Sequence, residues 1–566
     1  MLHDLYTPQG KALSATPSEI YPRPQLKRDS YVNLNGTWDF AVTEQEQPES
    51  FDKTILVPFC PESLLSGIHE HFPEGNSLWY RREFTLPEGF HKGKVLLHIG
   101  AADQKTEIYV NQRKMGSHIG GYDSFCTDIT DALEETNTLL IRVTDDLRDQ
   151  VLPYGKQTLT RGGMWYTPVS GIWQTVWLES VPETYVQDLS LSVTLESATI
   201  TVTPALNGTV TCEGKTYPLQ DGKAVITPEK PKLWSPENPH LYDFTVEAGQ
   251  DRFESYFALR TLEVKILHNI PRLCLNGRPY FFHGLLDQGY WSDGIYTPAS
   301  PDCCRWDIET MKRLGFNTLR KHIKAEPEEF YYLCDKLGMI VFQDMVNNGD
   351  YNFLRDTALP TVGVQKMNDK NLHKDPDTRK AFLSAMEAMV HQLKNHPCIC
   401  YWTIFNEGWG QFDSDSVYPI LKKLDPSRFI DATSGWFRRK CTDVDSRHIY
   451  FGSWKGLKPE KKPLVLSEFG GHCWAVEGHL FNPEKAYGYK SCKTREDFLK
   501  SVEELYRQKV LPAVKQGLCG AIYTQVSDVE DEINGLVTYD RQVVKPDFAS
   551  MQAIAKDLQK ALEESL

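Results

Sequence analysis

The sequence predicts two β domains followed by a (β/α)8 barrel, and three observations support this fold class. The chain has 566 residues, which is too many for one ordinary domain. Up to residue 264 it consists largely of short runs rich in β-branched and aromatic residues, separated by turn signals. From residue 265 onward, apolar runs alternate with helical patterns, which is typical of βα units.

The first 181 residues predict a jelly-roll sandwich. Runs such as "TWDFAVT", "KVLLHIG" and "IWQTVWLESV" have the alternation and residue types of strands, and helical periods are few. The stretch "SVPET" marks the predicted boundary. Residues 182–264 continue with strand-like runs such as "ATITVTPAL" and "LYDFTVEAG", and their length suits one immunoglobulin-like sandwich.

Residues 265–566 predict the barrel, because strand-like runs and helical stretches alternate throughout them. One helix is expected over 327–338, where apolar residues recur at helical spacing between Pro327 and Gly338. Eight βα units within about 300 residues is the usual size of a (β/α)8 barrel. The predicted strands are "YFFHGLLD", "TLRKHI", "MIVFQDM", "CICYWTIF", "FIDATSG", "HIYFGS", "PLVLSEF" and "CGAIYTQV".

Charge and composition exclude several classes of protein. The formal net charge of −14 and a pI near 5.7 argue against nucleic acids and anionic membranes as partners. No apolar run in the sequence is long enough to span a bilayer. The 13 cysteines match neither a disulfide framework nor a zinc site, which predicts a reducing compartment. Since the N-terminal stretch lacks the pattern of a signal peptide, we expect a cytoplasmic protein.

Two glutamates stand where the chemistry of a barrel is expected. Glu407 follows the fourth predicted strand and Glu468 lies at the end of the seventh, and each has a glycine nearby. In a (β/α)8 barrel, the C-terminal ends of the strands carry the active site. Two carboxylates facing one site suit glycosidic cleavage, since one protonates the leaving oxygen and the other attacks the sugar or activates water. The alternative interpretation is that both are solvated residues at strand ends.

The chain resembles glycoside hydrolase family 2, the family of β-galactosidases, β-glucuronidases and β-mannosidases. The resemblance covers nearly the whole chain, and it rests on motifs that occur in the family's order. It implies a jelly roll, an immunoglobulin-like sandwich and a barrel, in agreement with the strand and helix patterns. The motifs include "NLNGTWDF", "SGIWQTVWLE", "LNGRPYFFHG", "LGFNTLRKH", "NHPCICYWTIFNEG" and "SEFGG".

The resemblance also implies roles for four residues. Glu407 of "NEG" corresponds to the general acid/base and Glu468 of "SEFG" to the nucleophile of a double displacement with retention. Asn406 is then expected to bind the 2-hydroxyl of the sugar. Retention requires the two carboxyl groups to lie about 5–5.5 Å apart. Arg320 in "NTLRKH" is expected to keep Glu468 ionised, while apolar surroundings keep Glu407 protonated.

Further candidate substrate-binding residues lie near the predicted strand ends. Family members place histidines near the ends of the first two barrel strands, where they bind sugar hydroxyls, although a histidine satisfied inside the barrel is the alternative. Aromatic residues in this region form either a sugar-binding wall or part of the core. The candidates are His283, His322, Asp344, Trp436, Tyr450, Trp474 and Tyr523.

The sugar is predicted from one motif. The β-glucuronidases of the family carry Asn-x-Lys before a glycine that leads to "DRQ", whereas this chain has Glu532-Ile533-Asn534 before Gly535. A carboxylate-bearing sugar would lose its lysine unless Lys321 or Lys324 substitutes. The acidic stretch "SDVEDE" also favours a neutral sugar. We therefore expect a β-galactoside first, followed by a β-mannoside, an α-arabinoside or a uronide.

No cofactor is expected to be required. Galactosidases of the family often bind Mg²⁺ or Na⁺ near the acid/base, and Asp413 and Asp415 are the candidate ligands, but a hard cation needs more oxygens than these two residues supply. The expected partner is a carbohydrate, and a homo-oligomer is possible, since family members commonly form dimers or tetramers. Two rival interpretations stay open, a non-catalytic carbohydrate-binding protein and a metal-dependent barrel hydrolase. The latter would favour His-x-His at the first strand, where "FFHGLLD" supplies one histidine.

Overall fold

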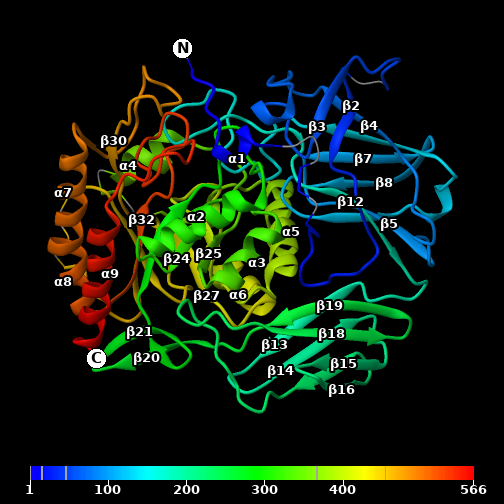
Figure 1. Ribbon diagram of the computed structural model, residues 1–566. Coiled ribbons are helices and arrows are strands. Elements are labelled where there is room, and N and C mark those ends of the chain that lie inside the picture. Colours follow the sequence, from blue (N-terminus) through cyan, green and yellow to red (C-terminus); the bar gives the residue numbers. More distant parts are fainter. Residues whose placement is uncertain are drawn as a thin grey trace.

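The computed structural model describes residues 2–13, 17–18, 20–44, 47–361, 363–364, 367–452, 454 and 456–566. It contains two β regions and a barrel surrounded by helices (Figure 1). The blue and cyan N-terminal sandwich lies to one side of the barrel, and a smaller green sandwich lies beneath both. The predicted sandwich–sandwich–barrel architecture is therefore confirmed.

The N-terminal sandwich is built from antiparallel strands. In β10 (Asn137–Thr144), buried and half-buried residues alternate, so Leu139, Ile141 and Val143 enter the core. One sheet has the order β1 (Tyr31–Asn33), β12 (Val176–Val181), β5 (Lys94–Ile99), β9 (Phe125–Asp128). The other has the order β3 (Lys53–Val57), β2 (Gly36–Thr43), β4 (Ser77–Phe84), β10, β7 (Lys105–Val110), β8 (Arg113–Ile119). A short pair consists of β11 (Gly171–Ile172) and β6 (Ala102–Asp103).

The second sandwich has a hydrophobic core of its own, in which Val210, Phe244 and Phe253 are buried. One sheet contains β13 (Asp188–Val193), β14 (Ala198–Thr203) and β17 (Lys223–Ile226). The other contains β16 (Lys215–Leu219), β15 (Gly208–Cys212), β18 (Tyr242–Ala248) and β19 (Asp251–Phe257). A three-stranded sheet then leads into the barrel, formed by β20 (Leu262–Leu267), β21 (Ile270–Leu275) and β22 (Arg278–Pro279).

Eight parallel strands form the nearly closed barrel, and all eight predicted runs overlap them. In chain order they are β23 (Phe282–Asp287), β24 (Thr318–Lys321), β25 (Ile340–Asp344), β26 (Ile399–Asn406), β27 (Phe429–Ser434), β28 (Asp445–Ile449), β29 (Leu464–Gly470) and β32 (Leu518–Thr524). The strand β28 begins before the predicted run 448–453, of which Ser453 lies outside the described residues. The reason is that β28 opens with the polar residues Asp445, Ser446 and Arg447, of which Ser446 is buried.

Helices cover the outside of the barrel (Figure 1). The predicted helix at 327–338 is α3 (Glu328–Leu337), and Gly338 ends it in a left-handed conformation with φ of 75°. The other helices and the remaining strands are α1 (Pro8–Lys11), α2 (Pro301–Arg313), α4 (Leu359–Thr361), α5 (Pro376–Leu393), α6 (Ser414–Leu424), α7 (Arg495–Leu505), α8 (Leu511–Lys515), α9 (Phe548–Glu563), β30 (His472–Trp474) and β31 (Lys490–Cys492). Short 3₁₀ or π turns are η1 (Leu64–Ser66), η2 (Thr130–Ala132), η3 (Leu354–Ala358), η4 (Asp369–Asn371) and η5 (Tyr506–Val510). In the part of the chain that the structure describes, no helix has the length and apolarity needed to cross a bilayer.

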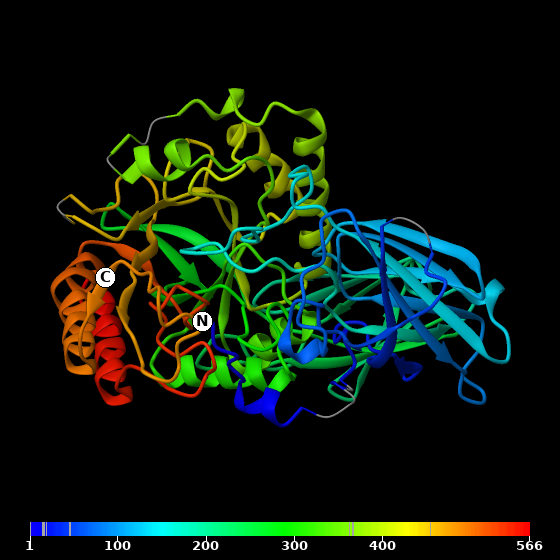
Figure 2. The same cartoon turned by 90° about the horizontal axis from the view of Figure 1, so that it is seen from above.

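The segment after β10 joins the N-terminal sandwich to the barrel. Figure 2 shows this cyan segment extending from the sandwich over the barrel. Arg161 forms an ion pair of 2.9 Å with Asp531, and the Tyr154 amide donates to the Asn347 carbonyl at 3.1 Å. The loops that follow β25 and β32 are therefore in direct contact with the first domain.

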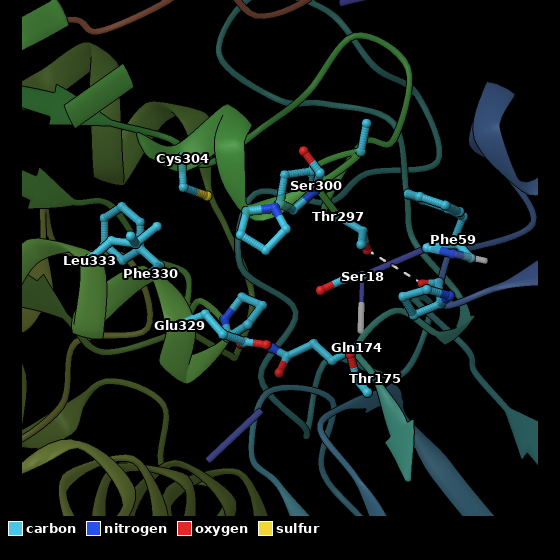
Figure 3. A pocket seen from close by; sticks show the side chains of 16 residues that line it. Ser18, Phe59, Gln174, Thr175, Thr297, Ser300, Cys304, Glu329, Phe330 and Leu333 are labelled. Atoms are coloured by element: carbon cyan, nitrogen blue, oxygen red, sulfur yellow. Dashed lines mark hydrogen bonds between the residues drawn. The ribbon is translucent and has the colours of Figure 1, made fainter. Parts of the chain in front are cut away.

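A small pocket lies at the same junction (Figure 3). Gln174 and Phe59 line it from the sandwich, and Thr297 and Glu329 line it from the barrel side. The Thr297 hydroxyl donates to the Trp173 carbonyl at 2.5 Å, which ties the two bodies together beside the pocket. Neither Glu407 nor Glu468 belongs to its lining.

Candidate active site

Glu407 directly follows β26, whose eight residues are all buried. The strand ends with Asn406, and Glu407 then takes a positive φ of 50°, which turns the chain away from the barrel wall. Its amide donates to the Ser434 carbonyl at 2.9 Å, so the turn is fixed by the neighbouring β27. The buried strand thus delivers an amide and a carboxylate to the C-terminal end of the barrel.

Glu468 belongs to β29, and two donors from other segments hold its carboxylate. Arg320 Nη1 donates to Oε1 at 3.0 Å, and the Tyr450 hydroxyl donates to Oε2 at 2.5 Å. Burial alone would raise the pKa of Glu468, but the neighbouring His448 and Arg320 lower it below its usual range. Glu468 is therefore held as a carboxylate.

Arg320 connects the ends of four barrel strands. From β24 it donates to Asp344 at 3.0 Å, to Asn406 at 2.8 Å and to Glu468. Its side chain is fully buried, so these acceptors replace the water it lost. Burial opposes the charge, but Asp344 and Glu468 raise the pKa of Arg320, which stays cationic.

His448 lies between the two glutamates. Its Nδ1 lies 2.7 Å from Glu407 Oε1, and its Nε2 lies 3.5 Å from Glu468 Oε1. One oxygen of each carboxylate and one nitrogen of His448 all lie within 4.8 Å of one another. Burial and the charge of Glu468 raise the pKa of Glu407, although the hydrogen bond with His448 acts in the opposite direction.

The donor set of this triad fits a hydrogen-bonded cluster better than a metal centre. Glu407 and Glu468 face opposite nitrogens of one imidazole, and Glu468 also accepts from Arg320. A metal ion would need several free ligand atoms directed at one point. The alternative ligand Asp415 already accepts from Arg439 at 2.6 Å.

Several predicted binding residues lie at or beside this centre. Tyr450 contacts Glu468 directly, and the ring of Trp436 lies 5.6 Å from that of His448. His322 Nδ1 lies 2.8 Å from Asp344 Oδ2, and burial lowers the pKa of His322 to about 4. Asp344 therefore belongs to the cluster through its hydrogen bond with Arg320, and His322 belongs to it through its contact with Asp344.

The structure does not bring three other candidates to the glutamates. His283 lies in the core, where its ring nitrogens contact the Gly315 carbonyl at 3.0 Å and the Tyr506 hydroxyl at 3.1 Å. Tyr523 packs behind β29, and its hydroxyl accepts from the His472 amide at 3.0 Å. Trp474 lies in β30 and is partly buried against the main core. For His283 and Tyr523 these contacts argue against sugar-binding roles.

Strand alternation explains why Thr524, and not Tyr523, lies beside Tyr450. Side chains alternate between the two faces of a strand, so Tyr523 and Thr524 point in opposite directions. It is Thr524 whose hydroxyl lies 3.0 Å from the Tyr450 hydroxyl, next to Glu468. His448 was not among the predicted site residues. The same alternation places it on the same face as Tyr450 in "HIY", and this spacing is the sequence signal that identifies it.

Lys156 was also missed, because it comes from the N-terminal sandwich. Its ammonium lies 5.3 Å from the ring centre of Trp409 and 5.5 Å from that of Tyr166. Burial lowers the pKa of Lys156, while the charges of Glu532, Glu468 and Glu407 oppose the shift. The Tyr166 hydroxyl donates in turn to Glu532. No sequence spacing connects a loop of the first domain to the end of β26.

Comparisons with known proteins agree with this architecture. The family model "Glycosyl hydrolases family 2, TIM barrel domain" matches residues 267–559, and "Glycosyl hydrolases family 2" matches residues 181–260. A putative β-glucuronidase of Formosa agariphila is 25% identical over 72% of this chain and 52% of its own length. A β-galactosidase of Thermoanaerobacter pseudethanolicus is 25% identical over 79% of this chain and 62% of its own length. The chain thus spans about half to three fifths of the length of these relatives.

Among solved structures, a β-D-glucuronidase from Dictyoglomus thermophilum superposes with a TM-score of 0.73 at 19% identity. The match covers 95% of this chain and 98% of that one, and at this identity it concerns the fold alone. The barrel model matches more than half of the chain, in the region that carries both glutamates. The chain therefore belongs to glycoside hydrolase family 2.

Proposed function

We propose that the protein is a retaining exo-acting β-glycosidase. The observation that carries the proposal is the closeness of Glu407 and Glu468, which present oxygens within 4.8 Å of each other and share His448. Retaining glycosidases hold their carboxyl groups about 5–5.5 Å apart, whereas inverting enzymes leave about 6.5–9.5 Å for a water molecule. The opposite pKa directions of the two carboxyls suit one acid and one nucleophile.

In this proposal the reaction takes two steps. Glu468 attacks the anomeric carbon while Glu407 gives its proton to the glycosidic oxygen, so the bond to the aglycone breaks as the glycosyl ester forms. Glu407 then takes a proton from water, which attacks the same carbon and releases Glu468. Asn406 Oδ1 is occupied by Arg320, and Nδ2 has no acceptor among the described residues, which supports a bond from Nδ2 to the 2-hydroxyl.

For the sugar, we propose a β-galactoside first. Asn534 stands where the Asn-x-Lys motif would supply lysine, and it donates to Glu532 at 3.0 Å. Two of the curated relatives at 25% identity, from Thermoanaerobacter pseudethanolicus and Pseudoalteromonas haloplanktis, are named β-galactosidases. A neutral sugar needs no cation at this position.

A β-uronide is the second candidate, and Lys156 is the observation that favours it. The two lysines that could replace the lysine of the Asn-x-Lys motif are already paired. Lys321 pairs with Asp287 at 2.7 Å, and Lys324 pairs with Glu326 at 3.0 Å. Within the described ranges, Lys156 has neither an ion pair nor a hydrogen bond from Nζ to a carboxylate, although three glutamates influence its pKa. Several relatives and fold neighbours are named β-glucuronidases.

The acidic stretch "SDVEDE" before Asn534 carries less uncompensated negative charge than its composition indicates. It therefore opposes the binding of a uronide less strongly. Asp528 pairs with Lys545 at 2.6 Å, and Asp531 pairs with Arg161 at 2.9 Å. The Glu530 carboxylate accepts from the Thr167 amide at 2.9 Å. Each of these carboxylates therefore already has a partner within the protein, and Lys545 and Arg161 compensate the charges of Asp528 and Asp531 before a substrate arrives.

A panel of aryl β-glycosides tests the proposal and the sugar together. We expect hydrolysis of the galactoside that survives a chelator and releases the β-anomer first, as observed by ¹H NMR. Release of the α-anomer would contradict the retaining geometry. Preference for the glucuronide or galacturonide would select the second candidate. In that case Lys156→Met should lower kcat/KM about 10- to 100-fold, as expected for a lost hydrogen bond to a charged group.

A further inference from the structure

Three buried serine hydroxyls meet beside His448, and the reaction described above does not use them. Ser434 ends β27, Ser446 belongs to β28 and Ser467 belongs to β29. The Ser434 oxygen lies 2.8 Å from that of Ser467 and 3.3 Å from that of Ser446, and the oxygens of Ser446 and Ser467 are 2.5 Å apart. We call these three residues the serine triangle. Since each side chain comes from a different strand, the barrel itself brings the hydroxyls together.

The serine triangle contacts the nitrogen of His448 that faces away from Glu407. Ser434 Oγ lies 3.0 Å from His448 Nε2, whereas Nδ1 lies 2.7 Å from Glu407 Oε1. The Ser434 hydroxyl donates its single hydrogen to Ser467, so toward His448 it can only accept. Nε2 therefore carries a hydrogen and donates it to Ser434.

With a hydrogen on Nε2, the role of Nδ1 depends on the charge of the ring. Nδ1 donates to Glu407 Oε1 only when the imidazole carries hydrogens on both nitrogens. Glu468 Oε1, 3.5 Å from Nε2, favours this cationic form, and Arg320 Nη1 at 3.5 Å opposes it. Burial raises the pKa of both glutamates and His448 lowers it, as a charged donor between them does.

The imidazole is held in a fixed orientation between these partners. The side chain of His448 is fully buried, and the ring centre of Trp436 lies 5.6 Å from that of His448. Gly435 has a positive φ of 84°, and a Cβ at this position would lie 2.6 Å from His448 Nδ1. The backbone at Gly435 therefore packs against the imidazole, and the two nitrogens keep their directions toward Glu407 and toward the serine triangle.

We propose that the serine triangle is a positioning device that holds His448 as a hydrogen-bond donor to Glu407. The inference rests on the proposed function, in which Glu407 gives a proton to the glycosidic oxygen. When Nδ1–H donates to Oε1, the proton of the acid is confined to Oε2, the oxygen that is left to face the substrate. The serines act only through His448, and none of them takes part in the chemical steps.

Hydroxyl groups suit this task because they accept from Nε2–H without adding a negative charge. A third carboxylate at this position would raise the pKa of both glutamates. The carboxyl that adjoins the triangle is Asp431 of β27. Burial raises the pKa of Asp431, while Ser446 and Arg320 lower it. The charged groups that act on His448 are therefore the two glutamates and Arg320, with Asp431 on the side of the serines.

The pH dependence of kcat/KM on an aryl glycoside of the sugar identified by the panel tests the proposal. Ser434→Ala removes the acceptor of Nε2–H and weakens His448 as a donor. Because His448 lowers the pKa of Glu407 and of Glu468, both pKa values should rise. Both limbs of the profile should therefore move to higher pH, by about 0.3–1 unit for one lost hydrogen bond.

Two further variants of the serine triangle test the mechanism and allow for poor folding of Ser434→Ala. Ser434→Thr keeps the hydroxyl, so both limbs should return to their positions in the parent protein. Ser467→Ala should shift them in the same direction as Ser434→Ala but by less, because Ser446 at 3.3 Å can accept the hydrogen of Ser434 instead. The Tm of each variant, measured beside the profile, separates a folding defect from a change in protonation.

Ser501→Ala is the matched control. The Ser501 hydroxyl is buried and lies 3.0 Å from His472 Nδ1, the same distance as between Ser434 and His448, and its loss should leave both limbs in place. Limbs that stay within about 0.1 unit in folded Ser434→Ala and Ser467→Ala, or that move to lower pH, would overturn the role of the triangle while leaving the glycosidase function intact. An equal shift in Ser501→Ala would also overturn it. Absence of turnover by the parent protein on every glycoside would instead overturn the proposed function.

Discussion

The end of β26 and the end of β29 carry the same residue type in different surroundings. Glu407 and Glu468 are both nearly buried, at 8% and 4% exposure. Arg320 and Tyr450 donate to Glu468, whereas Glu407 is held by one contact with His448. Burial raises the pKa of both carboxyls, but His448 and Arg320 lower that of Glu468 below its usual range. The difference between the proposed acid and the proposed nucleophile therefore comes from residues on other strands.

Removing the proposed nucleophile should have the largest effect. Glu468→Gln keeps the size of the side chain but cannot form the glycosyl ester, so kcat should fall by at least about 10³-fold, within the range known for essential catalytic groups. The Tm, measured beside kcat on an aryl glycoside, controls for folding. A variant that keeps more than a tenth of the activity would assign the nucleophile elsewhere.

Removing the acid should give a loss that depends on the leaving group. Glu407→Ala should cost about 10²- to 10⁴-fold on an alkyl glycoside, because the alkoxide needs a proton as it departs. A dinitrophenyl glycoside should lose far less in its first step, since its leaving group is acidic. The slope of log kcat/KM against leaving-group pKa measures the difference. Equal losses on both substrates would separate Glu407 from the acid role.

Arg320→Met tests whether the Arg320 cation causes the difference in pKa between Glu407, at the end of β26, and Glu468, at the end of β29. Asp344 and Glu468 would keep their buried charges without the Arg320 cation, so the free energy of unfolding should fall by about 3–5 kcal/mol. Because Arg320 lowers the pKa of Glu468, its loss should raise that pKa and move the acid limb of the pH–activity profile to higher pH.

Arg305→Met is the control for this variant. Arg305 is 40% exposed and lies 3.7 Å from Asp302, so its loss should change stability by no more than about 1 kcal/mol. An acid limb that stays in place in Arg320→Met, with the protein still folded, would show that Arg320 does not govern Glu468.

Tyr450→Phe should have the smallest effect of the four. The phenyl ring keeps the stacking on Tyr489, and the hydrogen bonds of the hydroxyl with Glu468 and Thr524 are lost. A hydrogen bond to a charged group contributes about 1.5–3 kcal/mol, so kcat should fall about 10- to 100-fold. The acid limb should shift upward, since this bond also lowers the pKa of Glu468. If the acid limb shifted further in Tyr450→Phe than in Arg320→Met, Tyr450 rather than Arg320 would be the donor with the greater effect on the pKa of Glu468.

The sequence predicted the barrel strands well where their residues are apolar. The prediction began β28 too late because the strand opens with the polar residues Asp445, Ser446 and Arg447, of which Ser446 faces the interior. Glu407 and Glu468 were predicted because parallel strands end at one edge of a barrel, and the resemblance to glycoside hydrolase family 2 added Asn406 and Arg320. Their proximity follows from that topology and needs no knowledge of side-chain contacts.

The remaining site residues depend on contacts that no sequence spacing reveals. His283 lies in the core, where its ring nitrogens contact the Gly315 carbonyl and the Tyr506 hydroxyl. Lys156 comes to the site from the N-terminal sandwich, whereas the ammonium group of Lys321 already forms an ion pair with Asp287. A residue type at a strand end is thus predictable, but its partners are a property of the folded molecule.

The most direct test of the central claim is covalent labelling. A 2-deoxy-2-fluoro glycosyl fluoride of the preferred sugar should trap the ester, because fluorine at C2 slows both steps while the good leaving group speeds the first, so the ester forms faster than water removes it. Mass spectrometry of the digested protein should then find one added sugar on Glu468. A label on Glu407, or on any other residue, would contradict the assignment of the nucleophile to the end of β29.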